Sequence, residues 1–391
     1  MVSIGFVYFC SVIKNNYELQ NDGTMKNILS KRTFIVLPLF LFSLHPLWGQ
    51  KSNFKNDICI PGKLYMLSDI RNDVFVEALI KRWRPYNDFV RFSGDCVYSR
   101  KLNRVASVDT PVDGSNMKIE LVNSDEFEII KEKAISICVG KKGIGTQEVT
   151  VQILGDSFVN GAFFRDALLS KNYIPGIKLV GLRNIKNEEG QYDEGRGGWT
   201  VKKYFEIPKG EMTSYHGYMQ PVGEYRYWGS CEFWKNCYKV INGELTDTEI
   251  VYNCGRYDQC ITKFDKETGY LAAPKKNDLM YDNARGSYMV YTGKKWKNVE
   301  VDERKWAFNY RKYLDMWNLD APKFFAQMLG LNDYRDSLTA DYREWNKKIA
   351  EMKESYYKAV PDGKFIILIP CTTCGSLNNI RGDFTLRQNA S

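Results

Sequence analysis

The alternation of apolar and polar positions divides the chain into a strand-rich first part and a mixed second part. Residues 51–147 contain short apolar runs between turn residues, as at 117–122 and 134–139. Short runs separated by turn signals are typical of a small β-sandwich, and we predict an accessory domain of this kind at 51–147. Because no clear sugar-stacking motif occurs there, we expect it to pack against the second part rather than to bind glycan.

The second part, residues 148–391, begins with the apolar run Val149–Leu154, which predicts a buried strand. Further apolar runs at 177–182 and 365–370 predict two more buried strands. The spacing of apolar residues predicts helices over 306–317, 321–329 and 340–359. Buried strands that alternate with helices favour an α/β fold with a parallel sheet.

Length and composition predict a folded chain of about two or three domains. The 391 residues are 44% hydrophobic and 26% charged, which is enough to bury a full core. The net charge of +8 is spread over stretches of mixed sign, such as 186–189 and 302–305. Since no long basic block is interleaved with aromatic residues, we expect no nucleic-acid partner.

The N-terminal region has the pattern of an export signal. A basic stretch at 25–32 precedes the apolar run 33–48. This run is too short and too interrupted by proline for a membrane span, so we predict a signal peptide at 25–50 that is cleaved near its end. Residues 1–24 would be an upstream extension, and we expect a secreted, periplasmic or cell-surface protein without an integral membrane span. The alternative is that the apolar run remains as an uncleaved membrane anchor.

Gly155-Asp156-Ser157 stands where the strand at 149–154 gives way to a helix near Phe158. A serine at this position suits nucleophilic attack, because open α/β sheets keep their sites at the carboxyl ends of the strands. The turn and the following helix N-terminus favour negative charge. Taken alone, the tripeptide is also ordinary turn chemistry, since Asp and Ser are common helix N-caps.

Two further segments follow in order, Tyr192-Asp193-Glu194-Gly195-Arg196-Gly197-Gly198-Trp199-Thr200 and Gly330-Leu331-Asn332-Asp333. The three motifs in this order resemble the SGNH (GDSL-type) hydrolase family, whose blocks are GDS, EG-x-x-GW and G-x-N-D. The resemblance extends from about Val149 to the last residue. It implies an α/β fold in which a flavodoxin-like parallel sheet forms the middle of a three-layer α/β/α domain over 148–391.

The resemblance also implies roles for single residues. Ser157 would be the nucleophile, and the oxyanion hole would consist of the Ser157 N–H, the Gly198 N–H and the Asn332 side-chain amide, with Gly197 as the substitute for Gly198. These residue types suit the roles, because glycine lets the backbone approach an acyl oxygen and a neutral amide donates without a titratable charge. Asp156 adjoins the nucleophile, so we interpret it as a structural acceptor and not as the triad acid.

The family pattern also includes an Asp-x-x-His near the C-terminus, in which the His takes the serine proton. The chain contains only His45 and His216, and residues 371–391 contain no histidine. His45 belongs to the expected signal peptide. His216 precedes the G-x-N-D motif, so we interpret it as structural, with service as a substitute base as the alternative. We therefore expect the chain to be incomplete at its C-terminus and catalytically impaired.

A segment rich in aromatic residues, 217–301, separates the second motif from the third and is interpreted as an insertion over the site. Its aromatic residues include Trp228, Trp234, Tyr252, Tyr257, Tyr270 and Trp296. They could stack on sugar rings, or they could form the segment's own core, which is the commoner use of such residues. Residues 281–288 have the character of a hairpin.

The cysteines suit an exported chain, and two pairs, Cys231/Cys237 and Cys254/Cys260, are close enough in sequence to form disulfides. Cys371-Thr372-Thr373-Cys374 is an isolated pair, which favours a disulfide or loop over a zinc site. We expect no metal or other cofactor.

These features together predict a secreted serine esterase that acts through an acyl-enzyme on Ser157. The expected substrate is an ester, in particular an O-acyl group on a polysaccharide. The alternative is a glycan-binding or cell-surface protein that retains the fold without the chemistry.

Overall fold

The computed structural model describes residues 57–58, 60, 62–68, 70–75, 79–81, 88–95, 97–100, 105–141, 148–170, 176–184, 192–334 and 342–368. The expected extension at 1–24, the expected signal peptide at 25–50 and the C-x-x-C motif at 371–374 lie outside these residues. Within the described residues, no helix is both long and apolar enough to cross a membrane.

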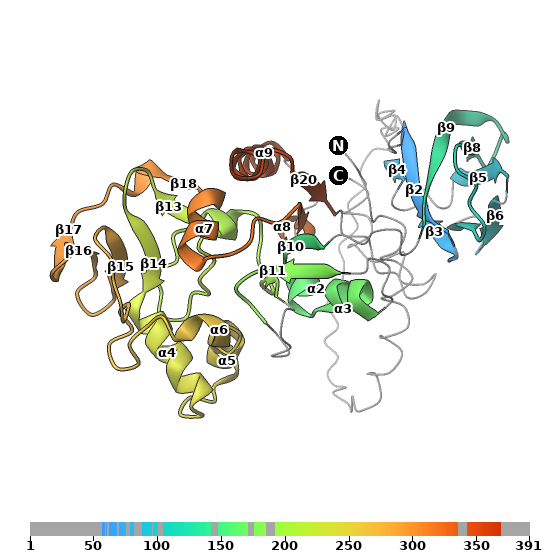
Figure 1. Cartoon of the computed structure of the whole chain (residues 1–391). Helices are drawn as coiled ribbons and strands as arrows, with labels where there is room; N and C mark the ends of the chain where they lie inside the picture. Colours follow the sequence, from blue (N-terminus) through green and yellow to red (C-terminus); the bar gives the residue numbers. More distant parts are fainter. Residues whose placement is uncertain are drawn as a thin grey trace, which may run out of the picture.

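The first strands of the chain form two small sheets that lie together at one end of the molecule (Figure 1). One sheet has the order β2-β9-β8-β5, the other β3-β7-β6, and β1 pairs with β4. The bounds are β1 Asp57–Ile58, β2 Lys63–Leu67, β3 Asn72–Phe75, β4 Ile80–Lys81, β5 Asp88–Gly94, β6 Val97–Arg100, β7 Val105–Val108, β8 Asn116–Asn123 and β9 Ile129–Gly140. Alternate residues of β8, Met117, Ile119 and Leu121, are fully buried. They share a core with Val74 and Val108 of the other sheet.

Strand β10 (Val149–Gly155) is at the centre of a five-stranded parallel sheet of order β11-β10-β19-β20, with β12 also paired to β10. The partners are β11 Ile177–Val180, β12 Glu194–Gly195, β19 Phe324–Met328 and β20 Lys364–Ile367. The helices nearest to it in the chain are α2 Ser157–Asn160, α3 Phe163–Ser170, α8 Leu331–Tyr334 and α9 Tyr342–Ala359. Ile153 packs with residues of α2 and α3, whereas Leu154 belongs to a large aromatic core. The strands predicted at 149–154 and 177–182 are thus confirmed.

The helix predicted over 321–329 is wrong, because Phe324–Met328 form strand β19 beside β10. Four of the five residues of β19 are buried, so the strand has no polar face. A short apolar run of this kind cannot be distinguished from a buried helix by its periodicity. The other two predicted helices correspond to α7 (Tyr310–Trp317), which follows a short strand, and to α9.

The aromatic segment and its flanks form a mixed sheet, a strand pair and several helices. The sheet has the order β14-β15-β16-β17, in which β14 and β15 are parallel, and β13 pairs with β18. The bounds are η2 Lys202–Phe205, β13 Met219–Pro221, β14 Arg226–Ser230, α4 Cys231–Ile241, α5 Thr248–Cys254, α6 Asp258–Ile261, β15 Asp278–Asp282, β16 Ser287–Tyr291, β17 Trp296–Val299, η3 Glu303–Lys305 and β18 Trp306–Phe308. The antiparallel pairing of β15 with β16 confirms the predicted hairpin.

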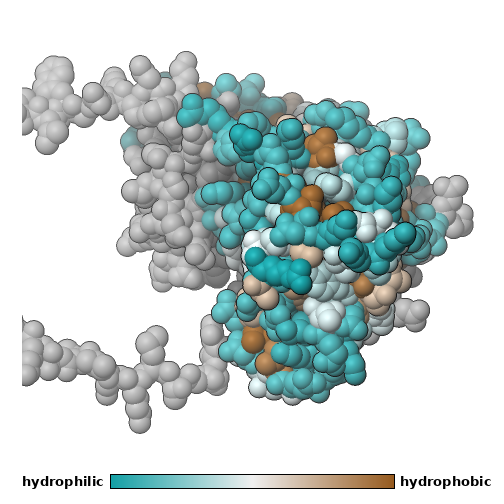
Figure 2. All heavy atoms as spheres, turned by 90° about the vertical axis from the view of Figure 1, so that its left-hand side faces the viewer, coloured by the Kyte–Doolittle hydropathy of each residue, from teal (hydrophilic) through white to brown (hydrophobic). Residues whose placement is uncertain are grey.

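Most of the aromatic residues in this segment face inward. Trp234 stacks on Phe264 with ring centroids 4.0 Å apart, and Trp228 meets Trp317 edge to face at 5.2 Å. The outer face of the segment is mainly hydrophilic, with hydrophobic side chains scattered over it (Figure 2). These aromatic residues therefore serve chiefly as a core. Tyr252 differs, because 36% of its surface is exposed.

The predicted three-layer, flavodoxin-like SGNH fold preceded by a β-sandwich is contradicted as a description of this chain. Among the described residues, the strands form six sheets. Only one of these, the five-stranded sheet around β10, is entirely parallel. The segment predicted as an insertion builds a mixed sheet whose aromatic core continues onto one face of the parallel sheet, through Leu154, Phe325 and Phe365. The sequence pattern indicated the strands but not this shared core, because aromatic residues dense enough to form a core look the same as residues lining a pocket.

The described cysteines Cys138, Cys231, Cys237, Cys254 and Cys260 are free thiols. Neither of the two pairs predicted from sequence spacing is therefore bonded. The last four of these cysteines are buried within the aromatic core, where they pack as small apolar residues.

Candidate active site at the carboxyl edge of the parallel sheet

Three parallel strands bring the sequence motifs to one edge of the sheet. Gly155, the last residue of β10, pairs in register with the last residues of β12 and β19. Ser157, Gly198 and Asn332 follow these strand ends within four residues. Since the strands are parallel, all three residues lie beyond the same carboxyl edge, where sites in open sheets form.

Ser157 is exposed at the start of α2. The preceding Asp156 is fully buried, and its carboxylate accepts the Phe158 N–H at 3.1 Å as the helix N-cap. Gly155 permits the tight turn, because a Cβ there would lie 2.7 Å from the Met328 carbonyl oxygen. Among the described residues, neither the Ser157 hydroxyl nor its N–H has a hydrogen-bond partner. The helix has only four residues. Its dipole therefore stabilises an oxyanion much less than the longer helix expected from the sequence would.

Gly197 and Gly198 are required as glycines for different reasons. Gly198 has a φ of +74° and open space at the Cβ position, so only its backbone conformation favours glycine. At Gly197 a Cβ would collide with the Tyr252 hydroxyl. Within the described part of the chain, the Gly198 N–H has no acceptor. Gly198 is therefore a free donor at this edge, as the oxyanion role requires.

Asn332 connects the loops that carry the other two motifs. Its side-chain amide donates to Asp156 Oδ2 at 3.3 Å and to the Trp199 carbonyl at 3.1 Å. The neighbouring Asp333 accepts the Val201 N–H at 2.9 Å and 3.2 Å through its two oxygens. Both amide hydrogens of Asn332 are thus engaged. An oxyanion would have to replace the longer bond, the one to Asp156, in order to use this donor.

The carboxyl groups of Asp156 and Asp333 are held in an unfavourable environment for charge. Burial raises the pKa of Asp156 to about 6, and the charge of Asp333 is a further cause. Burial also raises the pKa of Asp333 to about 6, against the opposing effect of the Val201 N–H. Full ionisation of the pair above pH 6 therefore costs free energy that the loop hydrogen bonds offset.

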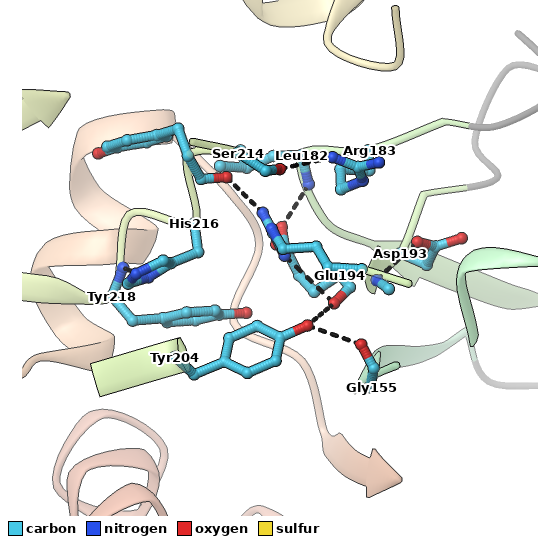
Figure 3. A network of polar contacts seen from close by, with 12 residues as sticks. Gly155, Leu182, Arg183, Asp193, Glu194, Tyr204, Ser214, His216 and Tyr218 are labelled. Atoms are coloured by element: carbon cyan, nitrogen blue, oxygen red, sulfur yellow. Dashed lines mark hydrogen bonds and ion pairs between the residues drawn. The ribbon is translucent and has the colours of Figure 1, made fainter. Parts of the chain in front are cut away.

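A buried polar network connects the ends of β10 and β12 to the surrounding core (Figure 3). Glu194 Oε1 accepts the Leu182 N–H at 2.7 Å and the Tyr313 hydroxyl at 2.6 Å, while Oε2 accepts Arg196 Nη1 at 2.8 Å. Both Glu194 and Arg196 are buried. The Tyr204 hydroxyl lies 2.7 Å from the Gly155 carbonyl oxygen and 2.6 Å from that of Glu194. These hydrogen bonds connect β10 and β12 to the aromatic core.

His216 does not face Ser157 as a base. Its Nδ1 accepts the Tyr218 N–H at 3.2 Å, which leaves Nε2 to donate to the Glu206 carbonyl at 2.9 Å. The ring is buried among aromatic side chains, including Trp199 at 5.7 Å. Burial, with Arg196 as a second cause, lowers the pKa of His216 to about 3. His216 is therefore a neutral structural residue in this arrangement, and it is the only histidine that the structure describes.

The sequence motifs did not indicate that the aromatic segment reaches the site. Tyr252 of α5 lies against Gly197, and its hydroxyl accepts a hydrogen bond from Asn160 Nδ2 at 2.9 Å. Asn160 is the last residue of α2, three positions after Ser157. The only signal in the sequence was the aromatic density of 217–301, which does not distinguish Tyr252 from its buried neighbours.

The described residues contain no group of three or more His, Cys, Asp or Glu side chains that could hold a metal ion. No protein-family model matches the chain, and no curated protein matches it. Two crystal structures from Bacteroides fragilis are distant matches. A candidate alpha-galactosidase is 13% identical with a TM-score of 0.18, over 32% of this chain and 28% of that protein. A candidate alpha-galactosidase/melibiase is 9% identical with a TM-score of 0.20, over 80% of this chain and 52% of that protein.

Proposed function

We propose that the chain is a serine ester hydrolase of SGNH-like site chemistry, with Ser157 as the nucleophile. The observation that carries this proposal is the exposed Ser157 hydroxyl at a sheet edge with two unoccupied backbone donors, the N–H groups of Ser157 and Gly198. Asn332 lies on the same edge, would become a third donor by giving up its bond to Asp156, and holds the Gly198 loop through the Trp199 carbonyl. Preorganised neutral donors of this kind are what acyl transfer requires.

In the proposed reaction, Ser157 Oγ attacks the ester carbonyl carbon and gives its proton to a solvent water molecule at the exposed edge, which returns a proton to the departing alcohol. The carbonyl oxygen becomes an oxyanion, which accepts hydrogen bonds from Ser157, Gly198 and Asn332. The tetrahedral intermediate expels the alcohol, which takes up a proton, and leaves an acyl group on Ser157. Water then attacks the acyl-enzyme and releases the acid. His216 is excluded from the base role in this proposal, because both of its ring nitrogens are bonded to the backbone.

The proposed substrate is an O-acylated carbohydrate outside the cell, to which the expected signal peptide at 25–50 would direct the protein. The partly exposed ring of Tyr252 beside Gly197 supports this choice, since an aromatic face next to the acyl site can stack on a sugar ring. Other aromatic residues of the segment, such as Trp234, are buried in the core and cannot do so.

The second candidate is a glycan-binding protein without turnover. It is favoured by the absence, among the described residues, of any hydrogen-bond partner for the Ser157 hydroxyl. Removal of the base from a Ser-His-Asp triad leaves a residual acceleration of roughly 10³ to 10⁴ over water, from the oxyanion hole and binding alone.

Hydrolysis of acetylated polysaccharides by the full chain distinguishes the two candidates. Acetate release from acetylated xylan and acetylated pectin is measured for the wild type, for Ser157→Ala and for Ser93→Ala, whose serine is exposed on β5. The esterase proposal predicts release that falls to background in Ser157→Ala and is retained in Ser93→Ala. Equal release from all three proteins would overturn it. Binding of the polysaccharide without any release would favour the second candidate.

A further inference from the structure

The residues next to the candidate nucleophile carry an unbalanced positive charge. Arg183 and Arg256 both donate to the side-chain oxygen of Asn160, Arg183 from Nη2 at 3.3 Å and Arg256 from Nη1. A neutral amide oxygen thus stands between two guanidinium groups. Within the described part of the chain, neither arginine forms an ion pair with a carboxylate. The buried Asp193 carboxylate, which pairs with Arg165, acts electrostatically on both arginines without a direct bond to either.

Arg256 is the member of this pair that solvent reaches. Arg183 is buried, with 1% of its surface exposed, and donates to Ser214, Tyr257 and the Tyr252 carbonyl. Arg256 is only partly buried, and within the described residues its side chain donates through Nη1 alone, to the carbonyl and side-chain oxygens of Asn160. Its Nη2 and Nε therefore remain available for another acceptor. Burial and the charge of Arg183 lower the pKa of Arg256, as expected for a guanidinium that lacks a counterion.

The position of Arg256 relates it directly to the proposed reaction. Its guanidinium lies 5.3 Å from the centre of the Tyr252 ring, and the Tyr252 hydroxyl lies against Gly197. Its partner Asn160 is three residues after Ser157 in α2, a rise of about 4.5 Å. Tyr252 and Arg256 both contact Asn160 at the end of α2, and Tyr252 also contacts Gly197, so together they form a wall beside α2. An acyl group at Ser157 would place the attached sugar beside this wall.

We propose that Tyr252 and Arg256 form a subsite for an oxyanionic group of the substrate, so that the ester acted on is carried by an acidic sugar with a carboxylate or sulfate. This inference rests on the proposed esterase function. The planar fork of an arginine binds both of these groups through paired hydrogen bonds, and the Tyr252 ring supplies an apolar face for the sugar. The charge of the incoming group would balance the two arginines.

A matched pair of substrates tests the subsite. Acetylated oligogalacturonate carries carboxylates, whereas its methyl-esterified form has the same sugar and acetyl groups without the charge. The proposal predicts that the wild type releases acetate from the charged form with a higher kcat/KM than from the methyl-esterified form. Arg256→Gln should lower the ratio of the two kcat/KM values by about 10- to 100-fold, as expected for the loss of a hydrogen bond between charged groups. Arg304→Gln, a change at an arginine with 90% of its side chain exposed, is the matched control and should keep the ratio.

The subsite proposal is contradicted if Arg256→Gln leaves the ratio of the two kcat/KM values unchanged while Ser157→Ala abolishes hydrolysis of both substrates. In that case the esterase function is retained without the subsite. If neither substrate is hydrolysed by the wild type, the esterase function fails. The subsite is then judged by calorimetric binding of the oligogalacturonate to the wild type and to Arg256→Gln. Weaker binding by the variant supports the subsite, and equal binding contradicts it. Competition by free galacturonate or by inorganic sulfate identifies which oxyanion is preferred.

Discussion

Replacement of Glu194 by Gln tests the buried polar network at the ends of β10 and β12. Glutamine has nearly the same shape as glutamate, and its single carbonyl oxygen can still accept the Leu182 N–H and the Tyr313 hydroxyl. Its NH₂ group would then face Arg196 Nη1, which is 2.8 Å from the carboxylate in the wild type. Two donors would meet, and the buried guanidinium of Arg196 would lose its counterion.

The magnitude follows from the burial of both partners, of which Glu194 is 0% and Arg196 1% exposed. Removal of one partner from a buried ion pair costs about 3–5 kcal/mol, because the other charge is left uncompensated. Loss of that amount is a large part of the free energy of unfolding of a typical domain, about 5–15 kcal/mol. We therefore expect Glu194→Gln to unfold at a much lower urea concentration than the wild type.

Urea unfolding followed by tryptophan fluorescence is a suitable assay, since most tryptophans lie between Trp199 and Trp345. The control is Glu206→Gln, which removes the exposed ion pair with Lys203 and should change the free energy of unfolding by less than about 0.5 kcal/mol. A double-mutant cycle with Arg196→Met should give a coupling energy of about 1–3 kcal/mol. Equal unfolding midpoints for Glu194→Gln and the control would refute the reasoning.

Three further predictions concern the site and its pH dependence. Gly197→Ala should destabilise the protein by about 1–3 kcal/mol through collision with Tyr252, and Tyr252→Ala in the same chain should remove most of that cost in urea unfolding; no relief would contradict the contact. His216→Gln should keep the esterase rate per folded molecule, because His216 is neutral and bonded to the backbone; a rate reduced 100-fold would make His216 the base. Burial raises the pKa of Asp193 to about 6, so the folded state binds more protons than the unfolded state between about pH 4 and pH 6 and stability falls as pH rises. The free energy of unfolding of Asp193→Asn, relative to that of the wild type, should therefore rise by about 2–3 kcal/mol from pH 4 to pH 7. A fall in this difference over the same pH range would contradict the prediction.

The strands of the parallel sheet could be predicted where apolar residues form a run bounded by turn signals, as at Val149–Leu154. Strand β19 could not, because Phe324–Met328 are buried on both faces and therefore lack the alternation that marks a strand. The overall fold was predicted wrongly for a related reason. Local patterns identify elements, whereas the sharing of one aromatic core by the mixed sheet and the face that includes Phe325 depends on contacts distant in sequence.

Only those residues of the candidate site that belong to the sequence motifs could be predicted from the sequence. The order of the motifs indicated that Ser157, Gly198 and Asn332 belong to one site, whereas only the structure shows that each follows a strand of the same sheet. The contact of Tyr252 with Gly197 could not be anticipated, because the two residues are 55 positions apart and Tyr252 belongs to none of the motifs. The role of Arg256 could not be anticipated either, because it depends on the lack of an ion-paired carboxylate among the described residues, which only the structure shows.

The most direct test of the account is identification of the acylated residue by mass spectrometry. The full chain is incubated with 4-nitrophenyl acetate, and its peptides are searched for an added acetyl group. The account predicts acetylation of Ser157, loss of that adduct in Ser157→Ala, and a reduction of the acylation rate by about 10²- to 10³-fold in Asn332→Ala. An unmodified Ser157 peptide, with acetyl groups only on lysines at a rate equal to that of Ser157→Ala, would contradict the central claim.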